Sequence, residues 1–168
     1  GAVVSAKKVV GGSVAPLAAS SLFGVSLCGV DRLRPVRSSG TAAATGEVWE
    51  VLMAVGARGL SGGNDDGKGA VFVLRLALTD LGSGAAGSCA VVQLEATLAA
   101  GSGGLPAGGL LSGDAFGASV AGVGDINGDG VGDLAVGAFG TDGGGFERSG
   151  AVWALLLEAA PTTVPSPS

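Results

Sequence analysis

The chain contains no histidine and no tyrosine, and its 168 residues include one methionine and two cysteines. The missing histidine removes the most frequent general base and the most frequent imidazole ligand of metal ions. It also excludes a Ser-His-Asp triad, although GASVAG at 117–122 partly resembles the nucleophile elbow G-x-S-x-G. Cys28 and Cys89 allow one disulfide without requiring it. Because nothing here supplies catalytic residues, we expect the chain not to be an enzyme.

Charged residues are also scarce, at 14% of the chain, and the formal net charge is −5. An acidic chain without a basic stripe is a poor match for nucleic acid, so we expect no nucleic-acid partner. Residues 9–30 lack any charge and follow Lys7 and Lys8, a pattern that a signal peptide or a membrane helix would also give. The run contains Pro16, several glycines and serines and few leucines, so its hydrophobicity is weak and we favour a β-strand interpretation.

Glycine, in contrast, is abundant: 34 of 168 residues, far above the usual share of about 7%. The glycines follow no collagen-like period, so we expect them to serve turns and close backbone approaches. Hydrophobic residues make up 47% of the chain, which argues against disorder, and helical periodicity is weak. The composition therefore predicts an all-β protein with many short strands.

A repeat is hidden among the glycines. Three stretches of the first half have a similar stretch in the second half. They are LFGVSLCGVD and AFGASVAGVGD, LMAVGARG and DLAVGAFG, and GKGAVFVLRL and RSGAVWALLL. Gly56 and Gly69 lie 81 residues before Gly137 and Gly150, whereas Phe23 lies 93 residues before Phe116 because the first copy has a longer loop. The copies predict strands at 25–30, 51–57, 70–76 and 90–96, and at 118–123, 134–138 and 151–157.

Four strands per repeat is the plan of a β-propeller blade, and a ring needs typically four to eight blades. We therefore expect about two four-stranded antiparallel blades, a fragment of a larger ring. KKVV at 7–10 resembles the last strand of a preceding blade, and PTTVPSPS at the end reads as a tail or linker. The expected divisions are residues 1–21, an outer strand and connector; 22–96, the first blade; 97–159, the second blade; and 160–168, the tail.

The stretch GDINGDGVGD at 124–133 crowds aspartates that would repel one another. Side-chain oxygens fall at positions 1, 3, 5 and 9 of the loop, and a backbone carbonyl is expected at position 7. These five ligands resemble the oxygen set that Ca²⁺ prefers, and the cation would turn the repulsion into attraction. The predicted metal ligands are Asp125, Asn127, Asp129, Val131 and Asp133. The alternative is a pair of Asn-Gly and Asp-Gly turns without metal.

Two other site types are excluded by their context. An EF-hand needs a glutamate at position 12 and flanking helices, but position 12 here is Val136, inside a predicted strand. The stretch GGNDDGKG at 62–69 is close to the sequence pattern of a phosphate-binding loop. That pattern needs Ser or Thr after the lysine and then a helix, whereas here Gly69 and a predicted strand follow. Without a helix N-terminus no dipole faces a phosphate, so we interpret this stretch as a solvated loop.

FGASVAGVGDINGDGVGDLAVGA at 116–138 resembles the FG-GAP repeat of integrin α-subunit β-propellers and of related surface proteins. Phe116 and Gly117 match the FG element, and Val136-Gly137-Ala138 matches the GAP element, with Phe139 in place of proline. The resemblance is strong over 103–157 and weaker over 7–96. It implies that the loop between the first two strands of the second blade binds Ca²⁺.

The first copy departs from this pattern, because Asp31 takes the first ligand position but Leu52 stands where Asp133 does. We therefore expect a degenerate first blade without a Ca²⁺ loop. Trp153 is expected to pack between blades, and Cys28 to be a small buried side chain.

The resemblance implies a Ca²⁺-binding module of an extracellular or cell-surface protein, with a structural and adhesive role toward protein or matrix ligands. Membrane contact would occur at most through regions outside this chain. An alternative is an accessory propeller domain attached to an enzyme such as a hydrolase, whose catalytic part lies elsewhere. A third interpretation, a membrane segment at 9–30 with a small exposed domain, is weaker.

Overall fold

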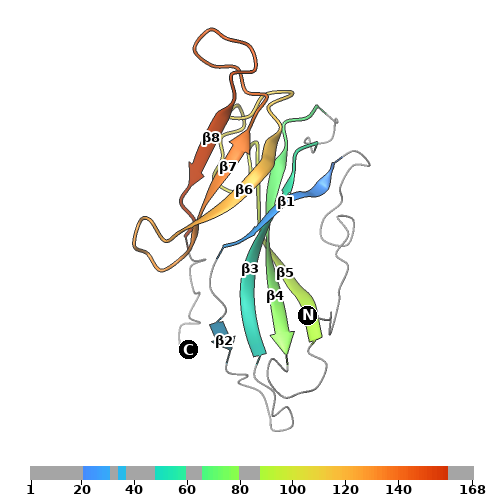
Figure 1. The fold of residues 1–168 in the computed structure, drawn as a ribbon, viewed down its shortest axis with the longest axis vertical. Helices are drawn as coiled ribbons and strands as arrows, with labels where there is room; N and C mark the ends of the chain where they lie inside the picture. Colours follow the sequence, from blue (N-terminus) through green and yellow to red (C-terminus); the bar gives the residue numbers. More distant parts are fainter. Residues whose placement is uncertain (1–20, 31–33, 37–47, 60–65, 80–87, 159–168) are drawn as a thin grey trace, which may run out of the picture.

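The protein is all-β in a computed structural model that describes residues 21–30, 34–36, 48–59, 66–79 and 88–158 (Figure 1). Across these ranges there is no helix, and therefore none that could cross a membrane. The strands are β1 (Phe23–Gly29), β2 (Arg34–Val36), β3 (Val48–Ala57), β4 (Ala70–Thr79), β5 (Ser88–Ala99), β6 (Phe116–Gly124), β7 (Asp133–Ala138) and β8 (Ala151–Leu155). The fold class predicted from the sequence is confirmed.

The first sheet follows the order β1-β3-β4-β5, and every neighbouring pair is antiparallel. This is the four-stranded meander predicted for a blade. The short β2, which the sequence pattern did not predict, pairs with the beginning of β3. Arg75 on β4 links two neighbouring strands: its guanidinium contacts Glu95 on β5 and, at 2.8 Å, Glu50 on β3. Hydrogen bonding to Glu95 and then to Glu50 raises the pKa of Arg75 above its ordinary value.

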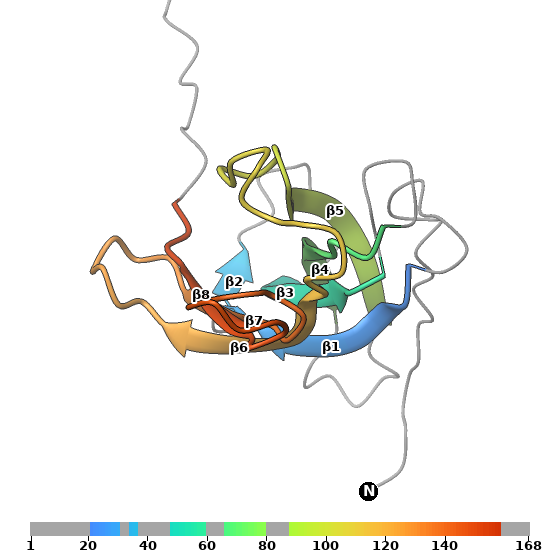
Figure 2. The same cartoon turned by 90° about the horizontal axis from the view of Figure 1, so that it is seen from above.

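The second sheet follows the order β6-β7-β8, again antiparallel. It lies beside the first sheet, with β6 next to β1 in both views (Figures 1 and 2). A hydrophobic core fills the space between the sheets. Its most buried members come from both: Ala54, Val71 and Val73 from the first sheet, and Phe116, Leu134, Val136 and Ala138 from the second. Burial of each large side chain of this kind contributes about 1.5–3 kcal/mol.

The two copies of the repeat share details of backbone geometry. The register of β1 against β3 shifts between Phe23 and Ser26, and that of β6 against β7 shifts between Phe116 and Ser119. The residues before these two phenylalanines both have positive φ, 52° at Leu22 and 56° at Ala115. Because left-handed backbone is strained for residues other than glycine, two independent occurrences at matching positions identify a shared structural unit.

Aromatic pairs repeat as well. Phe23 packs against Phe72 with ring centroids 5.7 Å apart, and Phe116 meets Trp153 edge-on at 6.0 Å. Trp153 packs against the core between the sheets, as its alternation in the strand predicted. Each pair joins the first strand of a unit to its third. The same contact therefore fixes the twist of both units.

The connection from β5 to β6 is a series of turns that closes back on the first sheet. Its Leu105 and Leu110 are buried in the core between the sheets, and Asp114 is 3% exposed, accepting a 2.7 Å hydrogen bond from the Leu111 N–H. The segment then runs beside the start of β4, where the Ala115 and Phe116 N–H groups donate to the carbonyls of Gly67 and Lys68, each at 2.9 Å. These bonds set where the second unit begins relative to the first.

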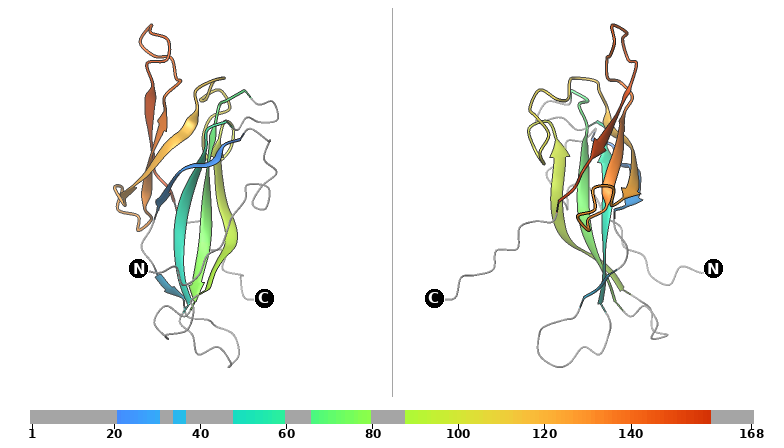
Figure 3. Two further views of the ribbon diagram at one scale, coloured as in Figure 1. Left: turned by 45° about the vertical axis from the view of Figure 1, so that its right-hand side comes forward. Right: turned by 90° about the vertical axis from the view of Figure 1, so that its left-hand side faces the viewer.

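Some predictions lie outside the described residues: the strand at 7–10, the tail at 160–168 and most of the long first loop. Across the described part of the chain, the second unit has three strands, and its path ends at β8. The loops between strands leave the sheets at their ends, as the two side views show (Figure 3).

Candidate metal centre

The aspartate loop joins β6 to β7 and protrudes from the end of the second sheet (Figure 1). Residues 125–130 are exposed, and the chain turns through Gly128 and Gly130, whose φ values are +82° and +87°. Only glycine adopts such angles without strain, which explains why the aspartates are separated by glycines.

Asp125, at the start of the loop, binds backbone across the turn. One carboxylate oxygen accepts the N–H groups of Gly128, at 2.7 Å, and of Asp129, at 3.1 Å. The other oxygen accepts the Gly130 N–H at 2.8 Å. Three N–H groups that would otherwise point at solvent are thereby held by one side chain. The carboxylate fixes the turn as an Asx motif does.

The middle of the loop is held by its own side chains. Asn127 donates from its amide to Asp129 Oδ2 at 3.0 Å, and its Oδ1 accepts the Asp129 N–H at 3.1 Å. Asp129 Oδ1 in turn accepts the Val131 N–H at 2.8 Å. Asn127, Asp129 and Val131, three of the predicted ligands, are therefore mutual neighbours.

Asp133 differs from the other two aspartates because it is fully buried, with 0% of its surface exposed. One of its oxygens accepts the Ile126 N–H at 2.9 Å, and the other accepts the Leu157 N–H, also at 2.9 Å. The first bond closes the loop, and the second ties the chain beyond β8 to the start of β7. A buried carboxylate is tolerated only where such bonds replace its water.

The donor chemistry of the loop fits a hard divalent cation. Three carboxylates, one amide oxygen and the backbone carbonyls of the turn are all oxygen ligands, which Ca²⁺ and Mg²⁺ prefer. A carboxylate has about four lone-pair sites. Asp125 uses three of them for N–H groups, while Asp129 and Asp133 use two each, so every carboxylate retains acceptor capacity.

The carboxylates are not gathered around one point. Within the described residues, no group of three or more His, Cys, Asp or Glu side chains is close enough to hold a metal ion. The predicted ligands thus fit a cation by type and order, while each carboxylate is presently directed at backbone N–H groups. The prediction of a metal site at these five residues is neither confirmed nor contradicted by this arrangement.

The equivalent position in the first unit lacks this chemistry. Leu52, 81 residues before Asp133, is an apolar side chain that packs against the core between the sheets. It cannot accept the two N–H groups that Asp133 accepts. Asp31, the remaining first-position acid, lies outside the described residues. The expected absence of a Ca²⁺ loop in the first unit stays a prediction.

The phosphate-loop-like stretch and Cys28, which the sequence also drew attention to, have contacts of their own in the structure. Asp66 and Lys68 of the near phosphate loop form an ion pair at 3.1 Å, and β4 follows them rather than a helix. Cys28 is a free, half-buried thiol. Burial raises its pKa above the ordinary value, while hydrogen bonds to the backbone of Gly122 and Ala54 act in the opposite direction.

Sequence reasoning missed two features of the site. It named Asp133 as a metal ligand and did not anticipate that the side chain is buried and accepts hydrogen bonds from two backbone N–H groups. It also missed the role of Asp142 in the next loop, whose carboxylate accepts the Arg148 N–H at 2.6 Å. The hydrophobic run directly after Asp133 was the available signal for burial, because a strand that is buried from its first residues encloses that residue too.

Comparison with curated proteins finds none that matches this chain. Comparison with family models gives one finding, and it coincides with the second sheet. Residues 116–155, from the start of β6 to the end of β8 with the aspartate loop between them, match the FG-GAP repeat, which is a repeat of β-propellers.

Proposed function

We propose that the chain is a Ca²⁺-binding, FG-GAP-type propeller module with a structural role in an extracellular or cell-surface protein. The observation that carries the proposal is the ordered oxygen set at Asp125, Asn127, Asp129, Val131 and Asp133, within the stretch that matches the FG-GAP repeat. Turn formation alone needs one Asn-Gly or Asp-Gly pair. It does not need oxygen-bearing residues at four alternating positions.

Asp125, Asn127, Asp129 and Asp133 would hold the ion through side-chain oxygens, and Val131 through its carbonyl. A bound divalent cation would supply positive charge that offsets the repulsion among three carboxylates. The chain itself supplies the winding: the N–H bonds of Asp125 and the positive φ values at Gly128 and Gly130 shape the turn, and the bond from the Ile126 N–H to Asp133 brings the two ends of the loop together. Little backbone ordering remains to oppose binding, which favours affinity.

The location and the partners rest on the resemblance to integrin α-subunit propellers. Extracellular Ca²⁺ modules bind with Kd values of about 10⁻⁴–10⁻³ M, and we expect the same range for this loop. A protein or matrix ligand, met through the surface of a complete propeller, is the partner that the resemblance supports. The role is non-enzymatic, in keeping with a sequence that contains no histidine.

Isothermal titration calorimetry with CaCl₂ tests the metal site directly. The wild-type chain is expected to bind one Ca²⁺, and Asp129→Asn is expected to weaken binding at least tenfold, because it removes one of three carboxylates from the site. Asp142→Asn is the matched control: it changes an exposed aspartate in the neighbouring loop and should bind as the wild type does. Absence of any Ca²⁺ heat in the folded wild-type chain would contradict the proposal.

A further inference from the structure

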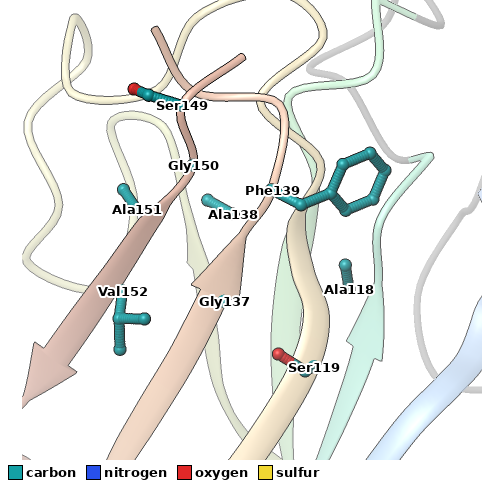
Figure 4. Close-up of a pocket in the computed structure, with 9 residues that line it drawn as sticks. All are labelled: Ala118, Ser119, Gly137, Ala138, Phe139, Ser149, Gly150, Ala151 and Val152. Carbon is teal, nitrogen blue, oxygen red and sulfur yellow. The ribbon is translucent and has the colours of Figure 1, made fainter. Parts of the chain in front are cut away.

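The second sheet carries an open hollow on the face turned away from the first sheet (Figure 4). Its volume is about 590 Å³, and it is lined by small residues and backbone of β6, β7 and β8, among them Ser119, Gly137, Gly150, Ala151 and Val152. Val152 is 77% exposed, although its neighbour Trp153 packs into the core on the opposite face. Phe139, which is 46% exposed, lines the same hollow, so the exposed apolar surface is contiguous, and such a patch marks an interaction site.

The repeat shows what occupies the equivalent face of the first sheet. Val71, which corresponds to Val152 at the 81-residue spacing, is 0% exposed because the second unit lies on it. Ser26 corresponds to Ser119 at the 93-residue spacing. Ser26 is half-buried, and its hydroxyl donates to the Gly117 carbonyl at 2.8 Å, whereas Ser119 is exposed. The two faces are chemically alike, but only the first is covered.

The covering element is the Phe116-Gly117 end of β6. A Cβ at Gly56 would lie 2.0 Å from the Gly117 carbonyl oxygen, and a Cβ at Gly69 would lie 2.0 Å from the Phe116 carbonyl oxygen. At these two positions only glycine leaves room for the backbone of the second unit. No backbone of another unit approaches the equivalent glycines in the hollow. A Cβ at Gly137 would meet only Ser119, and a Cβ at Gly150 would meet nothing closer than 3.7 Å.

Among the described residues one other strand start has the geometry to fill this hollow, and it is the Phe23-Gly24 end of β1. Gly24 has φ +87° and Gly117 has φ +85°, so the two strand starts share the same unusual turn. Gly117 is buried, whereas Gly24 is exposed with nothing within 4 Å of a Cβ placed on it. Leu27, on the same strand, is 64% exposed, while its counterpart Val120 packs against the core between the sheets.

We propose that a second copy of this chain docks the Phe23-Gly24 end of its β1 into the hollow of the first copy. The Ser119 hydroxyl would donate to the Gly24 carbonyl of the incoming chain, and Val152 would pack beneath Leu27 of that chain. The contact repeats between chains the interface that already joins the two units within one chain. It is head-to-tail, so it continues until a ring closes or a filament forms.

Two variants on opposite sides of the contact test the proposal. Val152→Glu places a charge in the hollow, and Leu27→Glu places one on the incoming strand; both side chains are exposed, so the fold should tolerate each change. Leu111→Glu is the control, because Leu111 is 60% exposed but lies in the β5-β6 connection, outside both surfaces. Circular dichroism verifies that all variants retain the β spectrum of the wild type.

Size-exclusion chromatography with light scattering, over a hundredfold range of concentration around about 1 µM, gives the readout. Wild type and Leu111→Glu should reach masses of two or more chains, while Val152→Glu and Leu27→Glu alone stay monomeric. An equimolar mixture of the last two should form a dimer that grows no further, since only one intact hollow meets one intact strand. A wild type that stays monomeric throughout, or assembly unaffected by Val152→Glu, would overturn the proposal. None of these outcomes depends on Ca²⁺, so they are separable from the metal site.

Discussion

At the scale of single residues, the second unit depends on a buried carboxylate. Asp133 is completely buried, and its two carboxylate oxygens accept hydrogen bonds from the backbone N–H groups of Ile126 and Leu157. The aspartate at position 9 of the loop therefore has a structural task before any ion binds. A ligand that is already fixed in the fold is also a ligand that needs no ordering when a cation arrives.

The Asp133→Ala variant measures how much this side chain contributes to the free energy of unfolding in the absence of metal. The variant removes a fully buried carboxylate that accepts the part-buried N–H groups of Ile126 and Leu157, so we expect a loss of about 1–3 kcal/mol in the free energy of unfolding. Urea denaturation in the presence of EDTA gives the value. Asp142→Ala, which removes an exposed carboxylate bonded to one N–H, should cost about 1 kcal/mol or less. Equal losses in the two variants would contradict the structural role of Asp133.

The thiol of Cys28 provides a second test at this scale. Because burial raises its pKa, the thiolate fraction at pH 8 should be lower in the folded chain than in the unfolded one. In a Cys89→Ser background, reaction with Ellman's reagent should be about tenfold slower, or more, in buffer than in urea. The same shift makes the contribution of this group to stability complete below the ordinary thiol pKa, with a decline as the pH rises above it. Equal rates in buffer and in urea would show that the side chain is open to solvent.

At the scale of elements, close contact between strands of different units is made by glycine. β6 lies against the start of β4 so tightly that a Cβ at Gly117 would come within 2.4 Å of the Ala70 carbonyl oxygen. The abundance of glycine in the sequence is explained in part by this contact and by its equivalents at Gly56 and Gly69. Composition alone predicted close approaches but not which backbones approach.

Gly117→Ala and Gly24→Ala form a matched pair that isolates this packing. Both positions have φ near +86°, so both substitutions carry the same backbone strain of about 1 kcal/mol. Only at Gly117 does the new methyl group collide with another strand, which should add about 1–3 kcal/mol of overpacking. Thermal and urea denaturation of the two variants, each in a Val152→Glu background that keeps the chain monomeric, give the difference. Equal destabilisation would mean that the two units are not held together as described.

The strands themselves were largely predictable because two copies of one pattern reinforce each other. The Phe-Gly, Val-Gly and Gly-Ala-Val landmarks located six of the eight strands in the described part of the chain, and the apolar run at 90–96 indicated β5. Alternation identified Trp153 as a core residue. The short β2 was not predictable, since Arg34-Pro35-Val36 has no counterpart in the other copy and its pairing depends on β3. The burial of Asp133 was not predicted either, although the apolar run that directly follows it in β7 was a signal for burial.

At the scale of the whole molecule, the two sheets share one core. Val71 and Val73 of the first sheet and Phe116, Leu134 and Val136 of the second are all nearly or completely buried in the same cluster. If one sheet unfolds, the core side chains of the other sheet lose their packing partners and become exposed to water. The sequence identified two units, but their mutual dependence follows only from the packing. We therefore expect the described part of the chain to unfold cooperatively.

Calcium should shift this single transition as a whole. With a Kd of about 10⁻⁴–10⁻³ M, 10 mM Ca²⁺ stabilises the folded state by about 1.4–2.7 kcal/mol, which for a chain of this size raises the Tm by roughly 3–10 °C. Differential scanning calorimetry in CaCl₂ and in EDTA measures the shift, and Asp129→Asn should reduce it by about half or more, in line with binding weakened at least tenfold. Although the ion would bind only the loop between β6 and β7, the shared core transmits its free energy to both sheets. Two separate transitions, of which only one moves with Ca²⁺, would show that the sheets unfold independently, and the coupling argued from the common core would then be wrong.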